Sequence, residues 1–241
     1  MEKKDFGLLG KNISYSFSKK YFEEKFRKLF LKNHNYNFFD IPDIDHVSPF
    51  LQNPNLVGMN VTIPYKQAII PFLDELSDEA MQIGAVNCVS FRNGKKIGYN
   101  TDCFGFEKSL LINKKDHHKK ALILGDGGAA KAVRYILDKH QIEHQTVSRK
   151  SELTFDNLSA DLVKDSLLII QTTPVGTFPN VGDYLEFPFD AISNQHYVID
   201  LIYNPSETVF LRKSAERGAT TLNGFYMLEQ QAEKAWQIWN S

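Results

Sequence analysis

The chain has only two cysteines, Cys88 and Cys103, among its 241 residues. Two cysteines cannot build a disulfide framework, and no Cys or His spacing typical of a zinc site occurs. We therefore expect two reduced thiols in the interior, a reducing cytoplasmic location and no bound metal. The pair His117 and His118 lies in a polar run, Asn113–Lys120, without further ligands at a supporting spacing. We interpret it as a solvated surface turn.

The chain also lacks long apolar runs and an excess of either charge. No apolar run approaches the ~20 residues that a membrane-spanning helix needs, and the N-terminal apolar stretch is too short for a signal sequence. The 28 basic and 29 acidic residues give a formal net charge of −1. Proteins that bind nucleic acid or a membrane surface by charge normally show a basic excess or patch, so we expect neither partner. This modest charge fits a monomer or a homodimer equally.

Apolar segments of strand length alternate with amphipathic segments of helix length along most of the chain. We predict strands at Phe6–Gly10, Asn35–Ile41, Leu56–Val61, Ala121–Leu124, Glu143–Ser148, Leu167–Gln171 and Tyr197–Leu201. We predict helices at Phe17–Lys32, Lys66–Leu73, Ala129–His140, Glu207–Arg217 and Phe225–Trp239. A hairpin is expected at Ala85–Phe91 and Lys96–Tyr99, because Asn93-Gly94 supplies the positive φ angles of a tight turn.

The polar run Asn113–Lys120 marks a junction between two α/β parts. The strands and helices that alternate after it predict a parallel, doubly wound sheet. The last helix, Phe225–Trp239, cannot simply extend that sheet, and we expect it to return to the first domain.

The run Gly125–Ala130 (GDGGAA) follows an apolar strand and opens a helix. This is the setting of a dinucleotide-binding fingerprint, in which Gly125 permits a tight turn and Gly127 lets the backbone approach a pyrophosphate. The small Ala130 lets helix and strand pack closely, and the helix N-terminus offers free N–H groups to phosphates. On its own the pattern is weak evidence, because a tight turn without any ligand also explains it.

The strand after the glycine turn ends in a basic segment. Enzymes that use NAD usually place Asp or Glu there, to bond the ribose 2′-hydroxyl. This chain instead has Ser148, Arg149 and Lys150. A guanidinium pairs with a 2′-phosphate that a carboxylate would repel, so we predict NADP rather than NAD. The alternative is an ordinary basic loop.

The stretch Gly58–Lys66 (GMNVTIPYK) sets Asn60, Thr62 and Lys66 around a predicted strand-to-helix turn. Taken alone, Lys66 is best interpreted as a surface lysine that begins a helix, since lysines are mostly exposed. The neighbouring motifs reverse that interpretation.

Together, the motifs of this chain resemble those of the shikimate dehydrogenase family, along nearly the whole length. They are Gly10–Ser18, Gly58–Lys66, Gly84–Asn87, Gly98–Asp102 with Gly105, Ser148–Lys150, Thr172–Pro174, Asp200–Pro205 with Thr208, and Gly224–Ala232. Each motif is modest by itself, but their shared order argues against chance.

The resemblance implies a two-domain α/β fold, with an N-terminal α/β substrate domain and a Rossmann-like NADP domain built on a doubly wound parallel sheet. Residues 1–102 and 223–241 would form the substrate-binding and catalytic domain, and residues 103–222 the NADP domain. It also implies the reversible reduction of 3-dehydroshikimate to shikimate, a step in the synthesis of chorismate and the aromatic amino acids.

The resemblance further implies roles for individual residues. The catalytic pair would be Lys66 and Asp102. The substrate would be bound by Ser16, Ser18, Asn60, Thr62, Asn87, Tyr203 and Gln231. The cofactor would be bound by Gly125, Gly127, Gly128, Ala129, Ser148, Arg149, Lys150, Thr172 and Gly224.

The chemistry of these side chains suits that substrate, a small carboxylate with several hydroxyls. The two serines offer uncharged donors to the carboxylate, and the amides donate and accept as ring hydroxyls require. The ammonium of Lys66 stabilises charge on the carbonyl oxygen and can deliver the proton. Asp102 would hold Lys66 and favour its charged form. The other interpretation of Asp102 is a capping residue before a helix near Phe104, which is compatible with catalysis.

The chain departs from the usual family pattern at Tyr15, Lys19, Cys88 and Gln171, the last of these expected on the nicotinamide side, and it is short for the family. Three alternatives stay open. A quinate-preferring relative is the nearest, because quinate adds one ring hydroxyl for which the pocket needs room. A non-catalytic NADP-binding sensor is disfavoured because Lys66 and Asp102 are both retained. A folate-linked dehydrogenase is disfavoured by the paired serines and by the Gly58–Lys66 pattern.

Overall fold

The computed structural model describes residues 2–13 and 16–241 and divides the chain into two compact units. Unit 1 comprises Met1–Thr101 and Ala232–Ser241, and unit 2 comprises Asp102–Gln231. Among the described residues, no helix has the length and apolar character needed to cross a membrane.

Unit 1 is built on a six-stranded mixed sheet in the order β2-β1-β3-β5-β6-β4. The strands are β1 (Lys4–Gly10), β2 (His34–Asp40), β3 (Leu56–Val61), β4 (Glu75–Leu76), β5 (Cys88–Arg92) and β6 (Lys95–Tyr99). Strand β1 pairs in parallel with β2 and β3, β5 is antiparallel to both β3 and β6, and β4 pairs in parallel with β6. The β5–β6 hairpin turns at Asn93 and Gly94, which both have positive φ angles as predicted.

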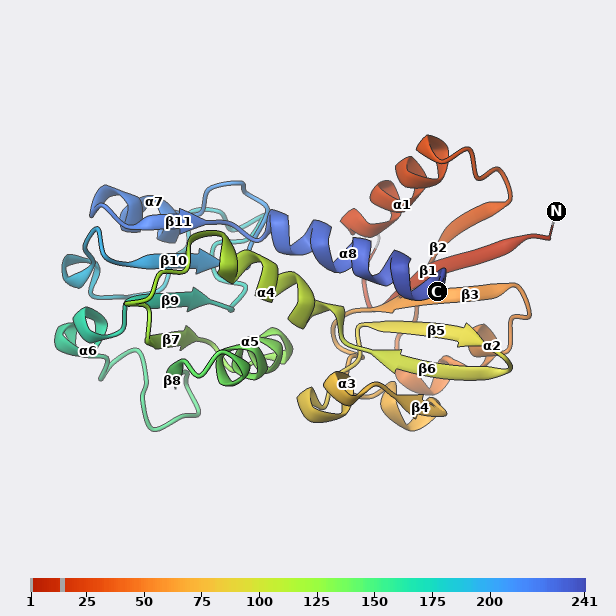
Figure 1. The fold of residues 1–241 in the computed structure, drawn as a ribbon, viewed down its shortest axis with the longest axis horizontal. Helices are drawn as coiled ribbons and strands as arrows, with labels where there is room; N and C mark the ends of the chain where they lie inside the picture. The colour runs from red at the N-terminus through yellow and green to blue at the C-terminus, as the bar shows by residue number, and fades with distance from the viewer. Residues whose placement is uncertain (1, 14–15) are drawn as a thin grey trace. The chain divides into compact units, whose positions relative to one another are not determined.

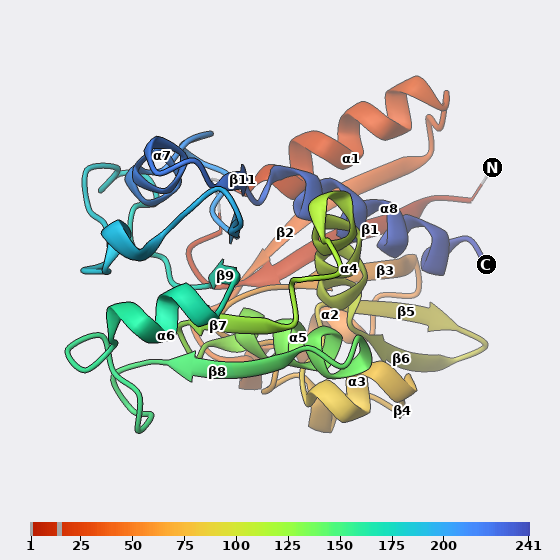
Figure 2. The ribbon, with the colours of Figure 1, turned by 60° about the vertical axis from the view of Figure 1, so that its left-hand side comes forward.

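Helices and short turns complete unit 1 (Figure 1). They are α1 (Phe17–Lys28), η1 (Ile44–His46), α2 (Ser48–Leu51), η2 (Ile70–Phe72), α3 (Asp78–Ile83) and the end of α8 (Phe225–Trp239). Helix α1 runs alongside β1 and β2 in both Figure 1 and Figure 2. Trp239 of α8 packs against Phe6 and Phe22 at centroid distances of 5.2 and 5.1 Å. The C-terminal end of the chain therefore belongs to the core of unit 1.

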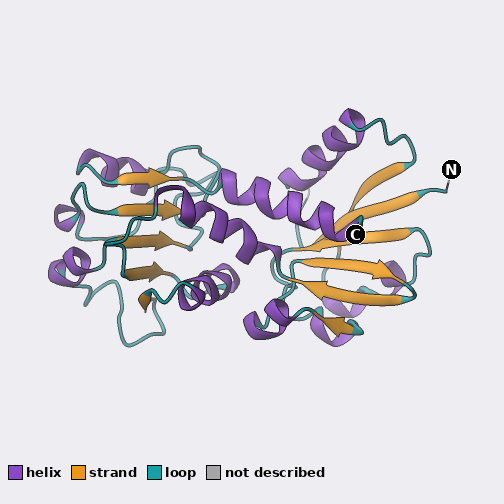
Figure 3. Cartoon of the chain, in the orientation of Figure 1, coloured by secondary structure: helices purple, strands orange, loops and turns teal. Residues whose placement is uncertain are grey.

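Unit 2 holds a five-stranded sheet in the order β11-β10-β9-β7-β8, and every pair is parallel (Figure 3). The strands are β7 (Lys120–Leu124), β8 (Glu143–Val147), β9 (Leu168–Gln171), β10 (Tyr197–Asp200) and β11 (Thr220–Leu222). The helical segments are α4 (Thr101–Asn113), α5 (Gly128–Lys139), α6 (Ala160–Asp165), η3 (Phe189–Ala191) and α7 (Val209–Glu216). Since all strands are parallel, their carboxyl ends lie along one edge, where ligands bind in folds of this kind.

Two predicted helices differ from the structure by more than two residues at an end. The helix predicted at Lys66–Leu73 is wrong: the segment forms turns followed by the 3₁₀ turn η2. Pro71 lies within this segment and has no N–H to continue a helical ladder. The helix predicted to reach Lys32 ends at Lys28, because Phe30 takes a left-handed conformation with φ 57°.

The interpretation of the two adjacent histidines is wrong for one of them. His117 is exposed, but His118 is buried. Nδ1 of His118 accepts the Lys115 N–H at 3.0 Å, and Nε2 lies 3.0 Å from the Gln195 carbonyl oxygen. Burial lowers the pKa of His118. The ring is thus part of the packing of unit 2 and satisfies two backbone groups.

Candidate active site

The two predicted substrate-binding serines lie at the start of α1. Ser16 is the N-cap residue, and its Oγ accepts the Ser18 N–H at 3.3 Å. Ser18 is buried. A Ser at the N-cap is expected, because its oxygen satisfies an N–H that the first helical turn leaves unpaired. Tyr15, where the chain departs from the family pattern, lies outside the described residues.

Asn60 is the next-to-last residue of strand β3 in unit 1, where it is buried. Its Oδ1 accepts the hydroxyl of Tyr36 at 2.8 Å, and its Nδ2 donates to the carbonyl oxygen of Asn87 at 3.3 Å. Tyr36 also hydrogen-bonds with Ser18, and burial holds its pKa well above the usual value. The orientation of the Asn60 amide is therefore fixed from both ends, by a neutral tyrosine and by the backbone.

The turn that carries Thr62 and Lys66 is anchored through its backbone and through Tyr65. The Thr62 N–H donates to the Leu9 carbonyl oxygen at 2.9 Å, and the Lys66 carbonyl oxygen accepts the Val86 N–H at 2.7 Å. Tyr65 is buried and donates its hydroxyl to the Ile41 carbonyl oxygen at 2.8 Å. Lys66 itself is only half-buried. The turn is thus pinned to three parts of unit 1 while the lysine side chain keeps access to solvent.

Asn87 connects the hairpin to the start of α4. Its Oδ1 accepts the Thr101 N–H at 2.6 Å, and its Nδ2 donates to Thr101 Oγ1 at 3.0 Å. Asp102 follows as the second residue of α4 and is buried. The capping interpretation of Asp102 is therefore wrong, because the helix begins one residue earlier and the Asn87 side chain satisfies its first N–H. An acidic side chain in a first helical turn is favoured by the helix dipole.

The glycine turn follows β7 at the carboxyl edge of the sheet in unit 2. Gly125 has a φ of 113°, and a Cβ there would lie 2.7 Å from Thr172 Oγ1. Among the described residues, a Cβ at Gly127 or Gly128 would meet no atom within 4 Å, and the N-cap residue of α5, Gly127, has no side chain to occupy the helix N-terminus. Open space beside the first N–H groups of a helix is what a phosphate requires, so the residues present fit a dinucleotide pyrophosphate.

The basic segment that follows β8 lies beside this turn, because the Gly125 N–H donates to the Val147 carbonyl oxygen at 2.9 Å. Arg149 and Lys150 are exposed. Ser148 is buried, and its Oγ accepts the N–H groups of Lys150 and Ser151 at 3.2 and 3.1 Å. Two exposed cationic residues therefore stand on a turn that Ser148 stabilises.

Gln171, where the chain departs from the family pattern, is the last residue of β9, and Thr172 follows it. Thr172 donates both its N–H and its hydroxyl to the Leu124 carbonyl oxygen at 2.9 Å, which joins β9 to β7 just before the glycine turn. Gln171 is buried, accepts the Thr173 N–H at 2.5 Å and donates to the Val175 carbonyl oxygen at 3.2 Å. The amide oxygen and nitrogen of Gln171 therefore both bond to the loop that follows β9 and stabilise its conformation.

Tyr203 follows β10 on a loop that Asp200 braces. One carboxylate oxygen of Asp200 accepts the Ile202 N–H at 3.0 Å, and the other accepts the Thr208 hydroxyl at 2.6 Å. Asp200 is fully buried, and burial raises its pKa to about 6. The Gly224 N–H donates to the Ile202 carbonyl oxygen at 2.9 Å, so Gly224 packs against the same loop.

Gln231, on α8, is buried and donates to the Leu228 carbonyl oxygen at 3.0 Å.

These positions place the predicted residues in two groups. The predicted cofactor-binding residues follow β7, β8 and β9 at one edge of the sheet, apart from Gly224, which packs against the loop after β10. Within unit 1, hydrogen bonds join Ser18, Asn60 and Asn87 through Tyr36 and the backbone. Lys66 lies in unit 1 and Asp102 begins unit 2, so their pairing stays a prediction. Within the described part of the chain, Cys88 and Cys103 form no disulfide, and both thiols are buried, as expected.

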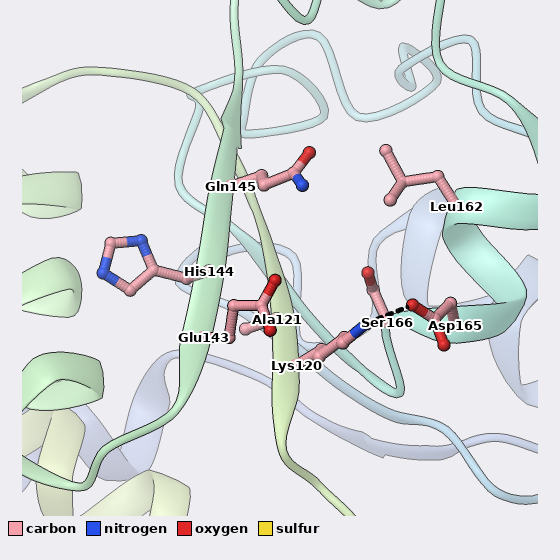
Figure 4. A pocket seen from close by; sticks show the side chains of 8 residues that line it. All are labelled: Lys120, Ala121, Glu143, His144, Gln145, Leu162, Asp165 and Ser166. Atoms are coloured by element: carbon pink, nitrogen blue, oxygen red, sulfur yellow. Dashed lines mark hydrogen bonds and ion pairs between the residues drawn. The ribbon is translucent and has the colours of Figure 1, made fainter.

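The opposite edge of the sheet in unit 2 has a small cavity of about 20 Å³ (Figure 4). It lies between the first residues of β7 and β8 and the end of α6, and the Lys120–Asp165 ion pair of 2.6 Å borders it. This volume holds about one water molecule. The cavity is therefore no candidate for a ligand site. Among the described residues, no group of three His, Cys, Asp or Glu side chains is placed to hold a metal ion.

Comparison with known proteins identifies the family. Residues 8–89 match the model of the shikimate dehydrogenase substrate binding domain. The shikimate dehydrogenase (NADP(+)) of Desulforamulus reducens is 37% identical in an alignment that covers 97% of this chain and 88% of the relative. The chain belongs to the shikimate dehydrogenase family. The resemblance seen in the motifs is confirmed.

Solved structures of this family agree with the fold. Shikimate dehydrogenase from Aquifex aeolicus superposes with a TM-score of 0.88 at 36% identity, covering 99% of this chain and 92% of that one. Quinate dehydrogenase from Corynebacterium glutamicum, in complex with NAD, has a TM-score of 0.89 at 25% identity, covering 99% and 94%. The predicted fold class, an α/β substrate domain with a Rossmann-like domain, is confirmed.

Sequence reasoning missed Tyr36, which hydrogen-bonds to two predicted substrate-binding residues. In the sequence it appears as one more aromatic residue of a predicted strand, and such residues are common in strand cores. The one available signal was chemical, since a buried tyrosine hydroxyl usually finds a polar partner. That signal names no partner, so Tyr36 could not be linked to Asn60 before the fold was known.

Proposed function

We propose that this protein catalyses the reversible NADPH-dependent reduction of 3-dehydroshikimate to shikimate. Its relatives are named as NADP-dependent shikimate dehydrogenases over almost the whole chain, so the predicted enzyme class and cofactor are confirmed. The structural observation that carries the proposal is the polar network of unit 1, in which Ser18, Asn60 and Asn87 are buried and fixed. Such preorganised amides and hydroxyls suit a polyhydroxylated carboxylate.

The proposed roles follow from the residue chemistry. NADPH, when bound, supplies the hydride for the carbonyl carbon. Lys66 then stabilises the negative charge that develops on the carbonyl oxygen and delivers the proton. Asp102 holds the Lys66 ammonium in position through the attraction of opposite charges. Ser16 and Ser18 donate to the carboxylate, whereas Asn60, Asn87 and Gln231 orient the ring hydroxyls, with Thr62 and Tyr203 beside them.

The cofactor residues divide by the part of NADP that they hold. Gly125, Gly127, Gly128 and Ala129 form the pyrophosphate turn, and Thr172 and Gly224 close it from neighbouring loops. Arg149 and Lys150 pair with the 2′-phosphate, on a turn that Ser148 holds. In this proposal residues 1–102 and 223–241 bind substrate and residues 103–222 bind NADP. The enzyme acts in the cytoplasm as a monomer or homodimer, with small molecules as partners and no nucleic acid or membrane.

Quinate is the second candidate substrate, because a quinate dehydrogenase is among the structures that superpose well. The test follows NADPH absorbance with 3-dehydroshikimate and then with 3-dehydroquinate. We expect turnover with the first at a much higher kcat/KM. A reversed preference would make the protein a quinate dehydrogenase, and no turnover with either substrate would favour the NADP-binding sensor.

The Lys66→Ala variant tests the proposed chemistry directly. We expect kcat to fall by about 10²–10⁴-fold, as for other general acids, while KM changes far less. A loss confined to KM would mean that Lys66 only binds substrate.

A further inference from the structure

The glycine turn of unit 2 contains a carboxylate where the expected ligand is a phosphate. Asp126 stands between Gly125 and Gly127 and is exposed. A negative charge in this turn opposes every phosphate of a dinucleotide. How strongly the Asp126 carboxylate repels these phosphates depends on which positive side chain neutralises it.

Arg134, on the second turn of α5, provides that neutralisation. Its Nη1 lies 2.8 Å from Asp126 Oδ1 and also donates to Thr146 Oγ1 at 3.4 Å. The guanidinium side chain is 27% exposed and the Asp126 side chain 47%. Arg134 therefore bridges three elements of unit 2, namely the glycine turn, α5 and β8.

The pair is tied to the end of β8, the strand that leads into the basic segment. Thr146 is two residues before Ser148, and the Gly125 N–H is bonded to the Val147 carbonyl oxygen. Asp126 therefore stands close to the segment that carries Arg149 and Lys150. An unpaired carboxylate at this place would cancel part of the positive charge that these two side chains offer to a 2′-phosphate.

We propose that the Asp126–Arg134 ion pair sets how strongly this protein distinguishes NADPH from NADH. Arg134 neutralises the carboxylate in the glycine turn, and this leaves Arg149 and Lys150 free to attract the 2′-phosphate. The inference rests on the proposed function for the location of the cofactor. It concerns binding alone, so it is tested without substrate.

Two opposite substitutions are predicted to move cofactor affinity in opposite directions. Arg134→Gln leaves Asp126 unpaired and should weaken NADPH about tenfold, because the 2′-phosphate adds about two negative charges, but NADH by much less. Asp126→Asn should tighten NADPH a few-fold and NADH hardly at all. The double variant should return close to the wild-type ratio, because each substitution then removes the charge that the other left unpaired.

The measurement is the Kd of NADPH and of NADH by isothermal titration calorimetry. A second pair of probes, adenosine 2′,5′-bisphosphate and 5′-AMP, isolates the 2′-phosphate. Lys139→Gln is the matched control, since it removes one positive charge from the other end of α5, where Lys139 pairs with Glu107. Thermal melting of each variant checks that the fold is kept.

The proposal predicts that the NADH/NADPH ratio of Kd values changes with Arg134 and with Asp126 but not with Lys139. Equal weakening of NADPH and NADH by Arg134→Gln would overturn it, because Arg134 would then act on the shared part of the cofactor. An unchanged ratio in both single variants would overturn it as well. The proposed function would fail in a different way: the protein would bind NADPH but would not reduce 3-dehydroshikimate.

Discussion

Replacing Tyr36 by Phe removes one hydroxyl from the interior of unit 1 and leaves the packing of the ring intact. The hydroxyl donates to Asn60 Oδ1 at 2.8 Å, and Tyr36 and Asn60 are only 2% and 5% exposed. Water cannot replace the lost donor at such a buried site without rearrangement. The Asn60 oxygen is then a buried acceptor without this partner, which costs about 1–3 kcal/mol of folding free energy. For a chain of this size, each kcal/mol lowers the melting temperature by roughly 2–4 °C.

The same change is expected to alter substrate binding. Asn60 is a proposed substrate contact, and without the Tyr36 hydroxyl its amide loses one of the two bonds that fix its orientation. We expect the KM for shikimate to rise by about three- to tenfold, equivalent to about 1 kcal/mol, with a smaller change in kcat. The KM for NADPH should stay constant, because the proposed cofactor site is built on unit 2.

The assay combines thermal melting with steady-state kinetics over both substrates. Tyr197→Phe is the matched control, because Tyr197 is also buried and its hydroxyl donates to the Ser109 carbonyl oxygen at 2.8 Å, away from every proposed site residue. It should lower stability by a similar amount without a change in KM. If Tyr36→Phe lowers stability but leaves the KM for shikimate unchanged, as in this control, Tyr36 has only a structural role and does not position Asn60 for substrate.

Three further predictions concern unit 2. Arg149→Ala should raise the KM for NADPH at least several-fold and that for NADH far less; equal effects would contradict a 2′-phosphate contact. Gly224→Ala places a Cβ against the Leu201 carbonyl oxygen and should cost about 3 kcal/mol or shift the loop, visible as a lower midpoint in urea. Burial raises the Asp200 pKa from 3.8 to about 6, so about 3 kcal/mol of stability is present below pH 4 and lost as pH rises through 6. The Asp200→Asn variant should lack this pH dependence. If its free energy of unfolding differs from that of the wild type by the same amount at every pH between 4.5 and 7.5, Asp200 does not contribute the dependence.

The parts of the fold that could be predicted are those with a local cause. Strand β3 has the predicted bounds, Leu56–Val61. They could be predicted because this mainly apolar run is followed by Pro64, three residues after its end. The hairpin was predictable because Asn93 and Gly94 tolerate positive φ angles. The glycine turn was predictable because its spacing and its place between a strand and a helix are themselves local.

The parts that could not be predicted depend on distant partners. Residues Lys66–Leu73 have a helical pattern, yet tertiary anchors hold them as turns, among them the bond from Tyr65 to Ile41. His118 looks like a surface residue in the run NKKDHHKK, but a carbonyl oxygen 77 residues away accounts for its burial. Local propensity is a weak guide wherever such long-range contacts decide the structure.

The buried polar residues of unit 1 form hydrogen bonds to one another. The same residues are proposed to bind the substrate. Hydrogen bonds run from Tyr36 to Asn60, from Asn60 to the Asn87 carbonyl oxygen, and from the Asn87 amide to Thr101, which directly precedes Asp102. Buried polar groups must be paired, so a site for a hydroxylated substrate can stay buried only if its amides also satisfy each other. The Asn87 amide has such a dual use in this chain, because it also positions Thr101 at the start of the helix that carries Asp102. Substitutions at either amide should therefore affect the geometry around Asp102 as well as substrate affinity, and kcat and KM should change together.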